Sequence, residues 1–161
     1  MAVREILIQP EPKLRKQAVT VSKIDSAIRK SVEDMVDTMR EVNGLGLAAN
    51  QVGILQKVVV CDDGTGLIVL INPKIVSAIG EQIGIEGCLS VPGLQGEVKR
   101  ANEVVVKGLD INGKSVKVEA EGLLARILQH ELDHLGGVLF IDRADPETLQ
   151  YIIEEESPEE A

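Results

Sequence analysis

Gln129-His130-Glu131-Leu132-Asp133-His134 is the stretch around which this chain is expected to fold. On a helix, residues four positions apart lie on one face, so His130 and His134 can present their imidazoles to a single ion. Glu131 would lie beside that ion, where a carboxylate can act as a general base. The chain contains only these two histidines. The pattern therefore predicts a metal site rather than a chance pair of core histidines.

The residues before this motif predict that its helix is buried and central. Apolar side chains occupy most of the helical circumference, namely Leu123, Leu124, Ala125, Ile127 and Leu128. Gly136 and Gly137 are expected to end the helix, and the apolar run at residues 138–141 can then cover it. Arg126 lies one turn before His130. We expect its stem to line a pocket while its guanidinium reaches water.

A catalytic metal site usually has three protein ligands and one open position, so a third ligand is required. Cys88 is the best candidate, because it lies in a turn-rich segment, residues 86–93, that could bring a thiolate to the helix. Cys61 lies in an apolar strand-like run and is expected to be a small buried hydrophobe. A Cys-His-His set suits Zn²⁺, Fe²⁺, Ni²⁺ or Co²⁺, so the residues alone leave the metal open.

The rest of the chain predicts one helix and a series of strands. Apolar residues at helical spacing predict an amphipathic helix that is capped by Asp25 or Ser26 and stopped by Asn43 and Gly44. Strands are expected at residues 57–61, 67–71, 74–79, 103–109 and 115–118, with turns between them that include Asn72-Pro73 and Asn112-Gly113. This order predicts an α+β fold in which antiparallel β-sheets pack around a buried central helix that carries the His-Glu-x-x-His motif.

The segment Gly44-Leu45-Gly46-Leu47-Ala48-Ala49-Asn50-Gln51 imitates a dinucleotide-binding fingerprint. That fingerprint must follow a strand and open a helix, whereas this segment follows a helix and leads into a strand. We therefore reject dinucleotide binding. The glycines are better explained as positions where another backbone approaches closely.

Composition excludes several kinds of partner. Phe140 and Tyr151 are the only aromatic residues, so there is almost nothing on which bases could stack. The net charge of −9 disfavours a phosphate backbone, and no specific nucleic acid partner is expected. The chain lacks a signal peptide pattern and a run of 18 apolar residues, so we expect a cytoplasmic protein without membrane attachment. Its two cysteines are expected to stay reduced.

Three stretches together resemble the motifs of peptide deformylases, in the same order and at similar spacing. They are Gly44-Leu45-Gly46-Leu47-Ala48-Ala49-Asn50-Gln51, Glu86-Gly87-Cys88-Leu89-Ser90 and Gln129-His130-Glu131-Leu132-Asp133-His134. The resemblance covers about residues 7–142. It implies a metal-dependent hydrolase of protein biosynthesis that removes the formyl group from the N-terminal formylmethionine of newly synthesised proteins and releases formate.

The resemblance also assigns roles to residues. Cys88, His130 and His134 would bind one divalent metal ion per chain, with Fe²⁺ as the ion in the cell and Zn²⁺, Ni²⁺ or Co²⁺ as substitutes. Glu131 would be the general base, and the Gln51 side-chain amide and Leu89 backbone N–H would stabilise the oxyanion. N-formylmethionyl nascent peptides would be the partners, together with a transient association with the ribosome. Substrate-binding residues would be Gly44, Leu45, Gly46, Glu86, Leu123, Arg126 and Ile127.

The expected domain organisation is one metallohydrolase domain at residues 1–145, followed by a C-terminal helical segment and an acidic tail at residues 146–161. Residues 154–161 contain five glutamates. A solvated appendage is expected there.

Two other functions fit part of the pattern. A metal-dependent peptidase would share the helix motif but would not require Cys88 or the glycine segment. A non-catalytic, metal-stabilised peptide-binding module would require neither Glu131 nor Gln51. Gln129 and Asp133 are expected to orient ligands or loops. The sequence does not show whether Glu86 and Arg100 form an ion pair.

Overall fold

The computed structural model describes residues 2–152. Within these residues, two antiparallel sheets have the strand orders β1-β2-β3-β6-β7 and β4-β5-β8. The helices are α1 (Ser26–Glu41), α2 (Gly122–Leu135) and α3 (Phe140–Arg143). The strands are β1 (Gly46–Ala48), β2 (Val58–Cys61), β3 (Ile68–Ile79), β4 (Gln82–Cys88), β5 (Val91–Arg100), β6 (Glu103–Leu109), β7 (Ser115–Glu121) and β8 (Gln150–Tyr151).

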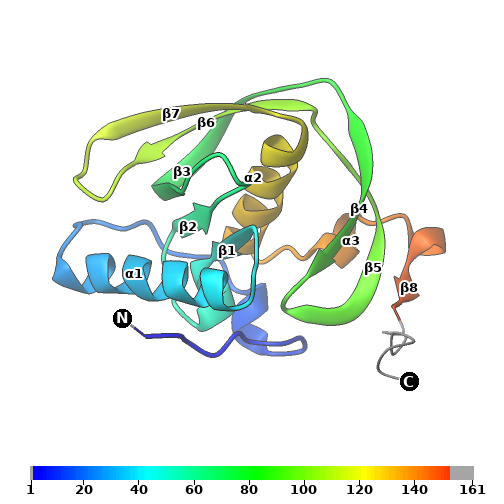
Figure 1. The fold of residues 1–161 in the computed structure, drawn as a ribbon, viewed down its shortest axis with the longest axis horizontal. Coiled ribbons are helices and arrows are strands. Elements are labelled where there is room, and N and C mark those ends of the chain that lie inside the picture. The colour runs from blue at the N-terminus through cyan, green and yellow to red at the C-terminus, as the bar shows by residue number, and fades with distance from the viewer. Residues whose placement is uncertain (1, 153–161) are drawn as a thin grey trace.

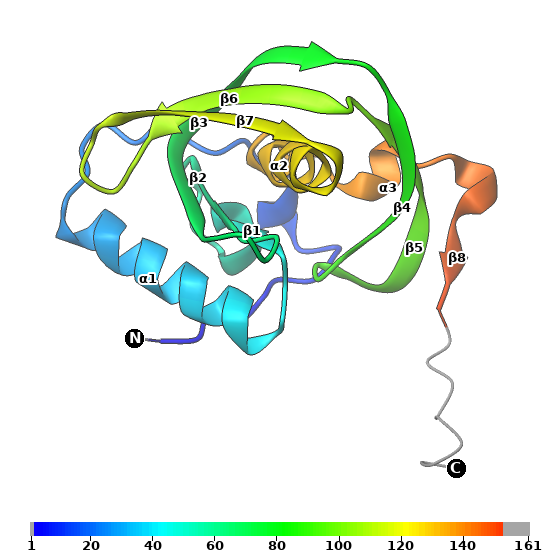
Figure 2. The ribbon, with the colours of Figure 1, turned by 45° about the horizontal axis from the view of Figure 1, so that its top comes forward.

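Helix α2 lies in the middle of the molecule. Figure 1 shows β3, β6 and β7 on one side of it and the β4–β5 hairpin on another. Figure 2 looks nearly along α2 and shows the sheets curving around it, with α1 outside β1 and β2. The predicted α+β fold with antiparallel sheets around a central helix is confirmed.

The sequence explains why α2 occupies this position. Its apolar face, including Ala125 and Leu128, packs on the apolar side chains of β2, β3 and β6. Ala125 and Leu128 are fully buried. Burying an aliphatic side chain of this kind contributes about 1.5–3 kcal/mol, so the sheet holds the helix firmly. Gly136 supplies the C-cap, as expected.

Helix α1 covers a second part of the core. The Asp25 carboxylate accepts a hydrogen bond from the backbone N–H of Ile28, which confirms the predicted N-cap. Met35 and Met39 are fully buried against β1 and β2. The helix therefore anchors β1, the strand that borders the site described below.

Two expectations about strands are wrong. Asn72-Pro73 does not end a strand, because β3 runs continuously through these two residues. The pairing of β3 with β6 is irregular at this point. Asn72 adopts a left-handed φ of 54°, and its side chain binds the backbone of Val21, so this pair joins the strand to the N-terminal segment. Residues 86–93 were expected to be a loop, yet most of them belong to the β4–β5 hairpin.

The C-terminal part also differs from the expected helical segment. Pro146–Thr148 forms one turn of 3₁₀ helix, and β8 then pairs with β5. This end of the described chain is therefore held to the second sheet. The acidic residues 153–161 lie outside the described residues. No helix among residues 2–152 is long and apolar enough to cross a membrane.

Gly137 provides a test of how tightly the end of α2 packs. Its φ is 78°, and an added Cβ would lie 2.5 Å from the Arg15 carbonyl oxygen. Gly93 has the same φ with no atom within 4 Å of its added Cβ. We expect Gly93→Ala to lower the free energy of unfolding by about 1–2 kcal/mol through backbone strain alone. Gly137→Ala should lower it by about 1–3 kcal/mol more, because its Cβ also clashes with the Arg15 backbone. Urea unfolding of both variants measures the difference, and equal costs would contradict this packing.

Candidate active site

Three predicted metal ligands meet where α2 passes the end of β4. Cys88 is the last residue of β4, and the turn at Leu89 and Ser90 follows it. His130 and His134 project from one face of α2 toward that turn. The potential ligand atoms of these three residues all lie within 4.8 Å of one another. Residues far apart in the sequence thus form one donor cluster.

The donor cluster fits a tetrahedral metal ion. The Cys88 Sγ lies 3.4 Å from the His134 Nε2. Metal–sulfur and metal–nitrogen bonds of about 2.3 and 2.0 Å at a tetrahedral angle separate these atoms by about 3.5 Å. The centroids of the two imidazole rings are 5.0 Å apart, with an angle of 67° between the ring planes. The three side chains therefore place their donor atoms close enough together to hold one divalent ion.

The surroundings of the two histidines shift their pKa values in opposite directions. Burial, followed by the neighbouring charges, holds the pKa of His134 well below its usual range, so its ring is neutral. Burial lowers the pKa of His130, but hydrogen bonds with Cys88 and Glu86 outweigh it and raise this pKa to about 10. The metal-free protein thus holds a proton that metal binding must release.

Glu86 fixes the orientation of His130. Its Oε1 lies 2.9 Å from the His130 Nδ1, and Arg100 donates to both carboxylate oxygens at 2.8 and 2.9 Å. Burial alone would raise the pKa of Glu86, but hydrogen bonds from Arg100 and His130 lower it to about 2. An ionised carboxylate can only accept, so His130 carries its proton on Nδ1 and turns Nε2 toward the donor cluster. Glu86 and Arg100 therefore do form an ion pair.

Glu131 lies beside the donor cluster without joining it. Its side chain is buried, and its Oε1 has no hydrogen-bond partner among the described residues. Burial raises the pKa of Glu131 to about 7. A Cβ at Gly46 would lie 2.6 Å from the Glu131 Oε2, so the missing side chain at Gly46 makes room for this carboxylate. The site thus holds a buried carboxylate that can exchange a proton near neutral pH.

Gln51 presents an amide to the same place. Its Oε1 accepts a hydrogen bond from the Ala48 backbone N–H at 3.0 Å. Its Nε2 donates to the Ser90 Oγ at 3.1 Å and lies 3.6 Å from the Cys88 Sγ. The amide is fixed by these contacts, with its donor end facing the donor cluster. Ser90 was not among the predicted site residues.

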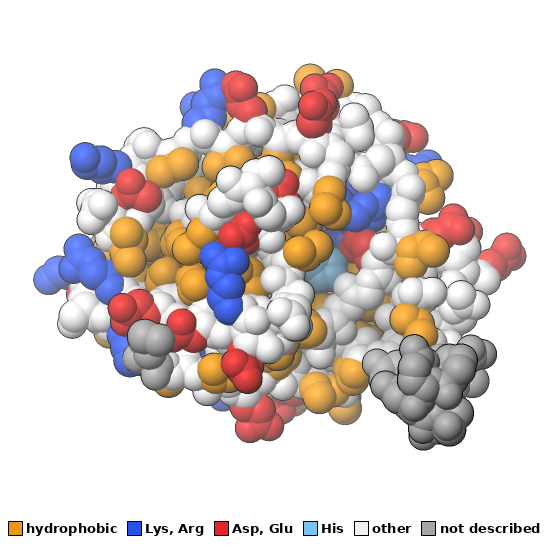
Figure 3. Space-filling view, viewed as in Figure 1, with side chains coloured by type: hydrophobic (Ala, Val, Ile, Leu, Met, Phe, Trp, Pro, Cys, Tyr) orange, Lys and Arg blue, Asp and Glu red, His pale blue; other side chains and the backbone are white. Residues whose placement is uncertain are grey.

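A pocket opens beside the donor cluster, and all the predicted site residues except the fully buried His134 line it. Figure 3 shows a histidine at the floor of a hollow bordered by apolar side chains. Two lining residues, Ile85 and Gly87 of β4, were not predicted. The alternation of apolar residues along β4 could have indicated Ile85. The other lining residues are Gly44, Leu45, Gly46, Gln51, Glu86, Cys88, Leu89, Leu123, Arg126, Ile127, His130 and Glu131.

Arg126 differs from its expectation. Its guanidinium does not reach water but is buried against the second sheet. It donates to Glu86, to the Gln82 side chain and to the Val98 carbonyl oxygen. Gly84 allows this approach, because an added Cβ would lie 3.1 Å from the guanidinium. Arg126 therefore ties α2 to β4 and β5, and the rest of its side chain borders the pocket.

Gln129 and Asp133 lie behind the donor cluster. The Gln129 side chain bonds both the backbone N–H and the carbonyl oxygen of Ala101. Asp133 accepts from Arg100 and from Arg143. Both residues thus join α2 to neighbouring segments. Arg143 was not among the residues predicted from the sequence.

A Cys-His-His donor cluster with a buried carboxylate at a pocket is typical of a metal-dependent hydrolase. A family model described as polypeptide deformylase matches residues 3–150. The chain belongs to this family.

Relatives and solved structures agree with this assignment. The peptide deformylases of Thermoanaerobacter pseudethanolicus and Thermomicrobium roseum are 53% and 48% identical to the chain. Each match spans 97% of this chain, with 96% and 94% of the relative, respectively. The peptide deformylase structure from Thermotoga maritima has a TM-score of 0.88 at 42% identity, covering 91% of this chain and all of that chain. The peptide deformylase structure from Synechococcus elongatus in complex with actinonin has a TM-score of 0.86 at 43% identity, covering 88% of this chain and 79% of that chain.

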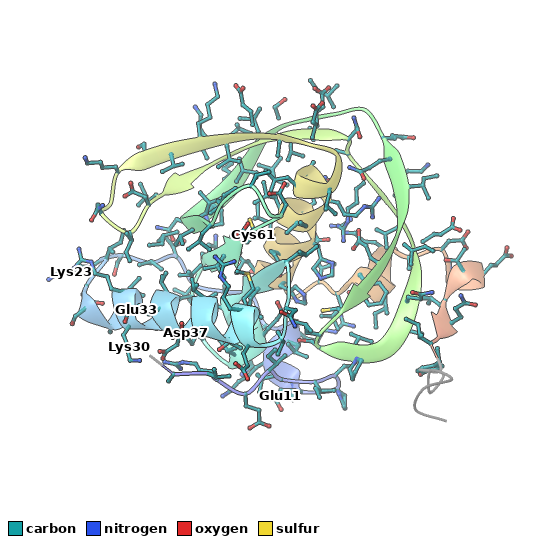
Figure 4. All side chains as sticks on the ribbon, viewed as in Figure 1. Glu11, Lys23, Lys30, Glu33, Asp37 and Cys61 are labelled. Carbon is teal, nitrogen blue, oxygen red and sulfur yellow. The ribbon has the colours of Figure 1, made fainter. Side chains whose placement is uncertain are left out.

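The two cysteines should differ in reactivity. Figure 4 labels Cys61 inside the molecule between β2 and α2, and burial raises its pKa to about 12. Only a thiolate reacts readily, so Cys61 should be inert in the folded protein while the less buried Cys88 reacts. With a thiol reagent, metal-free protein should show one reactive thiol that is lost in Cys88→Ser. A second thiol should react only after unfolding. Equal reaction rates of both thiols in folded protein would contradict this assignment.

Proposed function

We propose that this protein is a peptide deformylase that removes the formyl group from the N-terminal formylmethionine of newly synthesised proteins and releases formate. The single observation that carries the proposal is the convergence of Cys88, His130 and His134 beside the buried Glu131. Membership in the polypeptide deformylase family supports the choice of substrate.

The three ligands would hold one divalent ion. When bound, the ion supplies Lewis acidity for the attack of water on the formyl carbon. Glu131 accepts a proton from the attacking water and returns it to the leaving amine nitrogen. Burial raises the pKa of Glu131 to about 7 in the metal-free protein, and the positive charge of a bound ion would favour the ionised form that accepts the proton. The products are formate and a free amino terminus.

Gln51 and Leu89 would stabilise the negative charge that develops on the formyl oxygen. The Gln51 Nε2 already faces the Cys88 Sγ, so it can donate a hydrogen bond to the formyl oxygen of a substrate placed beside that sulfur. Leu89 follows Cys88 directly and would contribute its backbone N–H. Fixed donors of this kind need no reorganisation during the reaction.

The pocket would receive the methionine side chain. Its walls include the exposed apolar side chains of Leu45 and Leu123 and the buried Ile127. The side chains of Glu86 and His130 would border the pocket, and the aliphatic part of the Arg126 side chain would form part of its wall. Gly44 and Gly46 would let the peptide backbone lie along the edge of β1 as an added strand.

A metal-dependent peptidase is the second candidate, because it would use the same helix motif. The thiolate ligand favours the deformylase. It donates more charge than a carboxylate and leaves the ion a milder Lewis acid, which suits an easily attacked formyl carbon.

The ion in the cell is proposed to be Fe²⁺, with Zn²⁺, Ni²⁺ or Co²⁺ able to occupy the same ligands. Action on nascent chains in the cytoplasm, with transient association with the ribosome, follows from the proposed substrate.

Replacing Glu131 with Gln tests the base. The amide keeps the size of the side chain but cannot take a proton. Glu131→Gln should keep one metal ion per chain and release formate from formyl-Met peptides about 10²–10⁴-fold more slowly. His134→Ala should instead lose metal, because it removes a ligand. Metal content and formate release are measured on the same preparations. Full activity in metal-replete Glu131→Gln would remove Glu131 from the mechanism.

Air exposure tests the metal. Iron-loaded protein should lose activity in air through oxidation of the ion and Cys88, whereas nickel-loaded protein should keep it. Both forms are prepared without oxygen at equal occupancy and assayed over time after aeration. Equal stability of the two forms would count against Fe²⁺ as the working ion.

A further inference from the structure

We infer that Arg143 is a positioning residue for the metal ligand His130 and acts through Asp133, Arg100 and Glu86. The inference rests on the proposed function only in that it takes His130 as a metal ligand. Arg143 belongs to α3 and lies outside the pocket, so it contacts neither substrate nor metal.

The connection begins at the surface. The Nε and Nη2 of Arg143 donate to the two Asp133 carboxylate oxygens at 2.6 and 2.9 Å. This paired geometry fixes the plane of the carboxylate, which a single hydrogen bond would leave free to rotate. The Arg143 side chain is 48% exposed, whereas that of Asp133 is only 15% exposed.

The connection continues inward through Arg100. Its Nη1 donates to the Asp133 Oδ2 at 2.6 Å, and its Nε and Nη2 hold both oxygens of Glu86. A guanidinium is planar, so fixing one edge fixes the direction of the other. Arg100 is 3% exposed, and water therefore competes little with these hydrogen bonds. The orientation of Asp133 is transmitted to Glu86.

The connection ends at the metal ligand. Glu86 accepts from the His130 Nδ1 at 2.9 Å, which sets the rotation of the ring and the direction of Nε2. Arg143 thus supplies the outermost of four linked contacts between the surface and His130, two of which are paired hydrogen bonds. Without it, Asp133 can turn away from Arg100, and the support behind Glu86 loosens.

An ordinary surface ion pair would contribute about 0–1 kcal/mol to stability and would not affect the site. The chain offers a matched control for this alternative. Arg15 donates two hydrogen bonds to Asp142, the neighbour of Arg143, and its side chain is 44% exposed. Among the described residues, neither Arg15 nor Asp142 makes a hydrogen bond or ion pair with Glu86, Arg100 or Asp133. Arg15 also donates to the Gly137 carbonyl oxygen, just beyond the end of α2. Replacing either arginine removes a similar arginine–aspartate ion pair. Only the pair of Arg143 is connected to His130 through further hydrogen bonds.

The experiment compares Arg143→Met, Arg143→Lys and Arg15→Met with the unchanged full chain. Cobalt alone is the spectroscopic probe, because its visible absorption reports ligand geometry. Zinc release to a chelator reports how well the ligands are held. Thermal unfolding of the metal-free proteins reports general stability. Formate release gives kcat and KM separately.

We expect Arg143→Met to alter the cobalt spectrum, to speed zinc release and to lower kcat at unchanged KM. Zinc release and kcat should each change by up to about tenfold, which is the smaller effect known for residues that support metal ligands without binding the metal. Arg143→Lys should behave like Arg143→Met, since lysine keeps the charge without the two-donor fork. Arg15→Met should leave all three readouts within error of the unchanged protein while lowering thermal stability as much as Arg143→Met does.

The inference is overturned if Arg143→Met matches Arg15→Met in the cobalt spectrum and in zinc release. Full rescue by Arg143→Lys would also overturn it, since charge alone would then suffice. Absence of formate release by the unchanged protein would refute the proposed function instead. The cobalt and zinc readouts would still decide the role of Arg143.

Discussion

The rest of the site depends on the buried carboxylate of Glu86. It accepts hydrogen bonds from Arg100, Arg126 and His130, which come from β5 and α2. Removing one member of such a buried ionic group costs about 3–5 kcal/mol, because the remaining charges lose their partners. The same carboxylate therefore stabilises the contact between the second sheet and α2 and orients His130, a proposed metal ligand. The packing of α2 on the second sheet and the geometry of the site thus depend on the same hydrogen bonds.

This constraint explains why the ligands come from two elements that the sequence separates widely. Cys88 lies at the end of β4, and β4 reaches α2 through the hydrogen bonds that Arg126 makes to Gln82 and Glu86. The two sheets share no strand, and α2 packs against the first while Arg126 bonds it to the second. An ion bound by the donor cluster would add a further link between β4 and α2, and its binding energy would contribute to the stability of the fold.

Much of this could be predicted because the relevant signals are local. The helix that carries His130 and His134 follows from residue spacing, and the Asp25 cap follows from side-chain chemistry. The β4–β5 hairpin escaped prediction because Pro92, Gly93 and Gly96 resemble loop residues, whereas its strands are held by pairing across the hairpin. The buried guanidinium of Arg126 escaped for a similar reason. Its partners Gln82 and Val98 lie far away in the sequence, and only the tertiary fold brings them together.

The close approach of Gly46 to Glu131 has a consequence for how these sequences can vary. An added Cβ at position 46 would overlap the Glu131 carboxylate and the carbons behind it, all within 3.0 Å. A side chain at position 46 would thus displace the Glu131 carboxylate from its place beside the donor cluster. Position 131 can be replaced by a residue of the same length while Gly46 stays, but position 46 cannot gain a side chain while the Glu131 carboxylate keeps its place. A family that keeps this carboxylate is therefore expected to keep glycine at position 46, although 84 residues lie between the two positions.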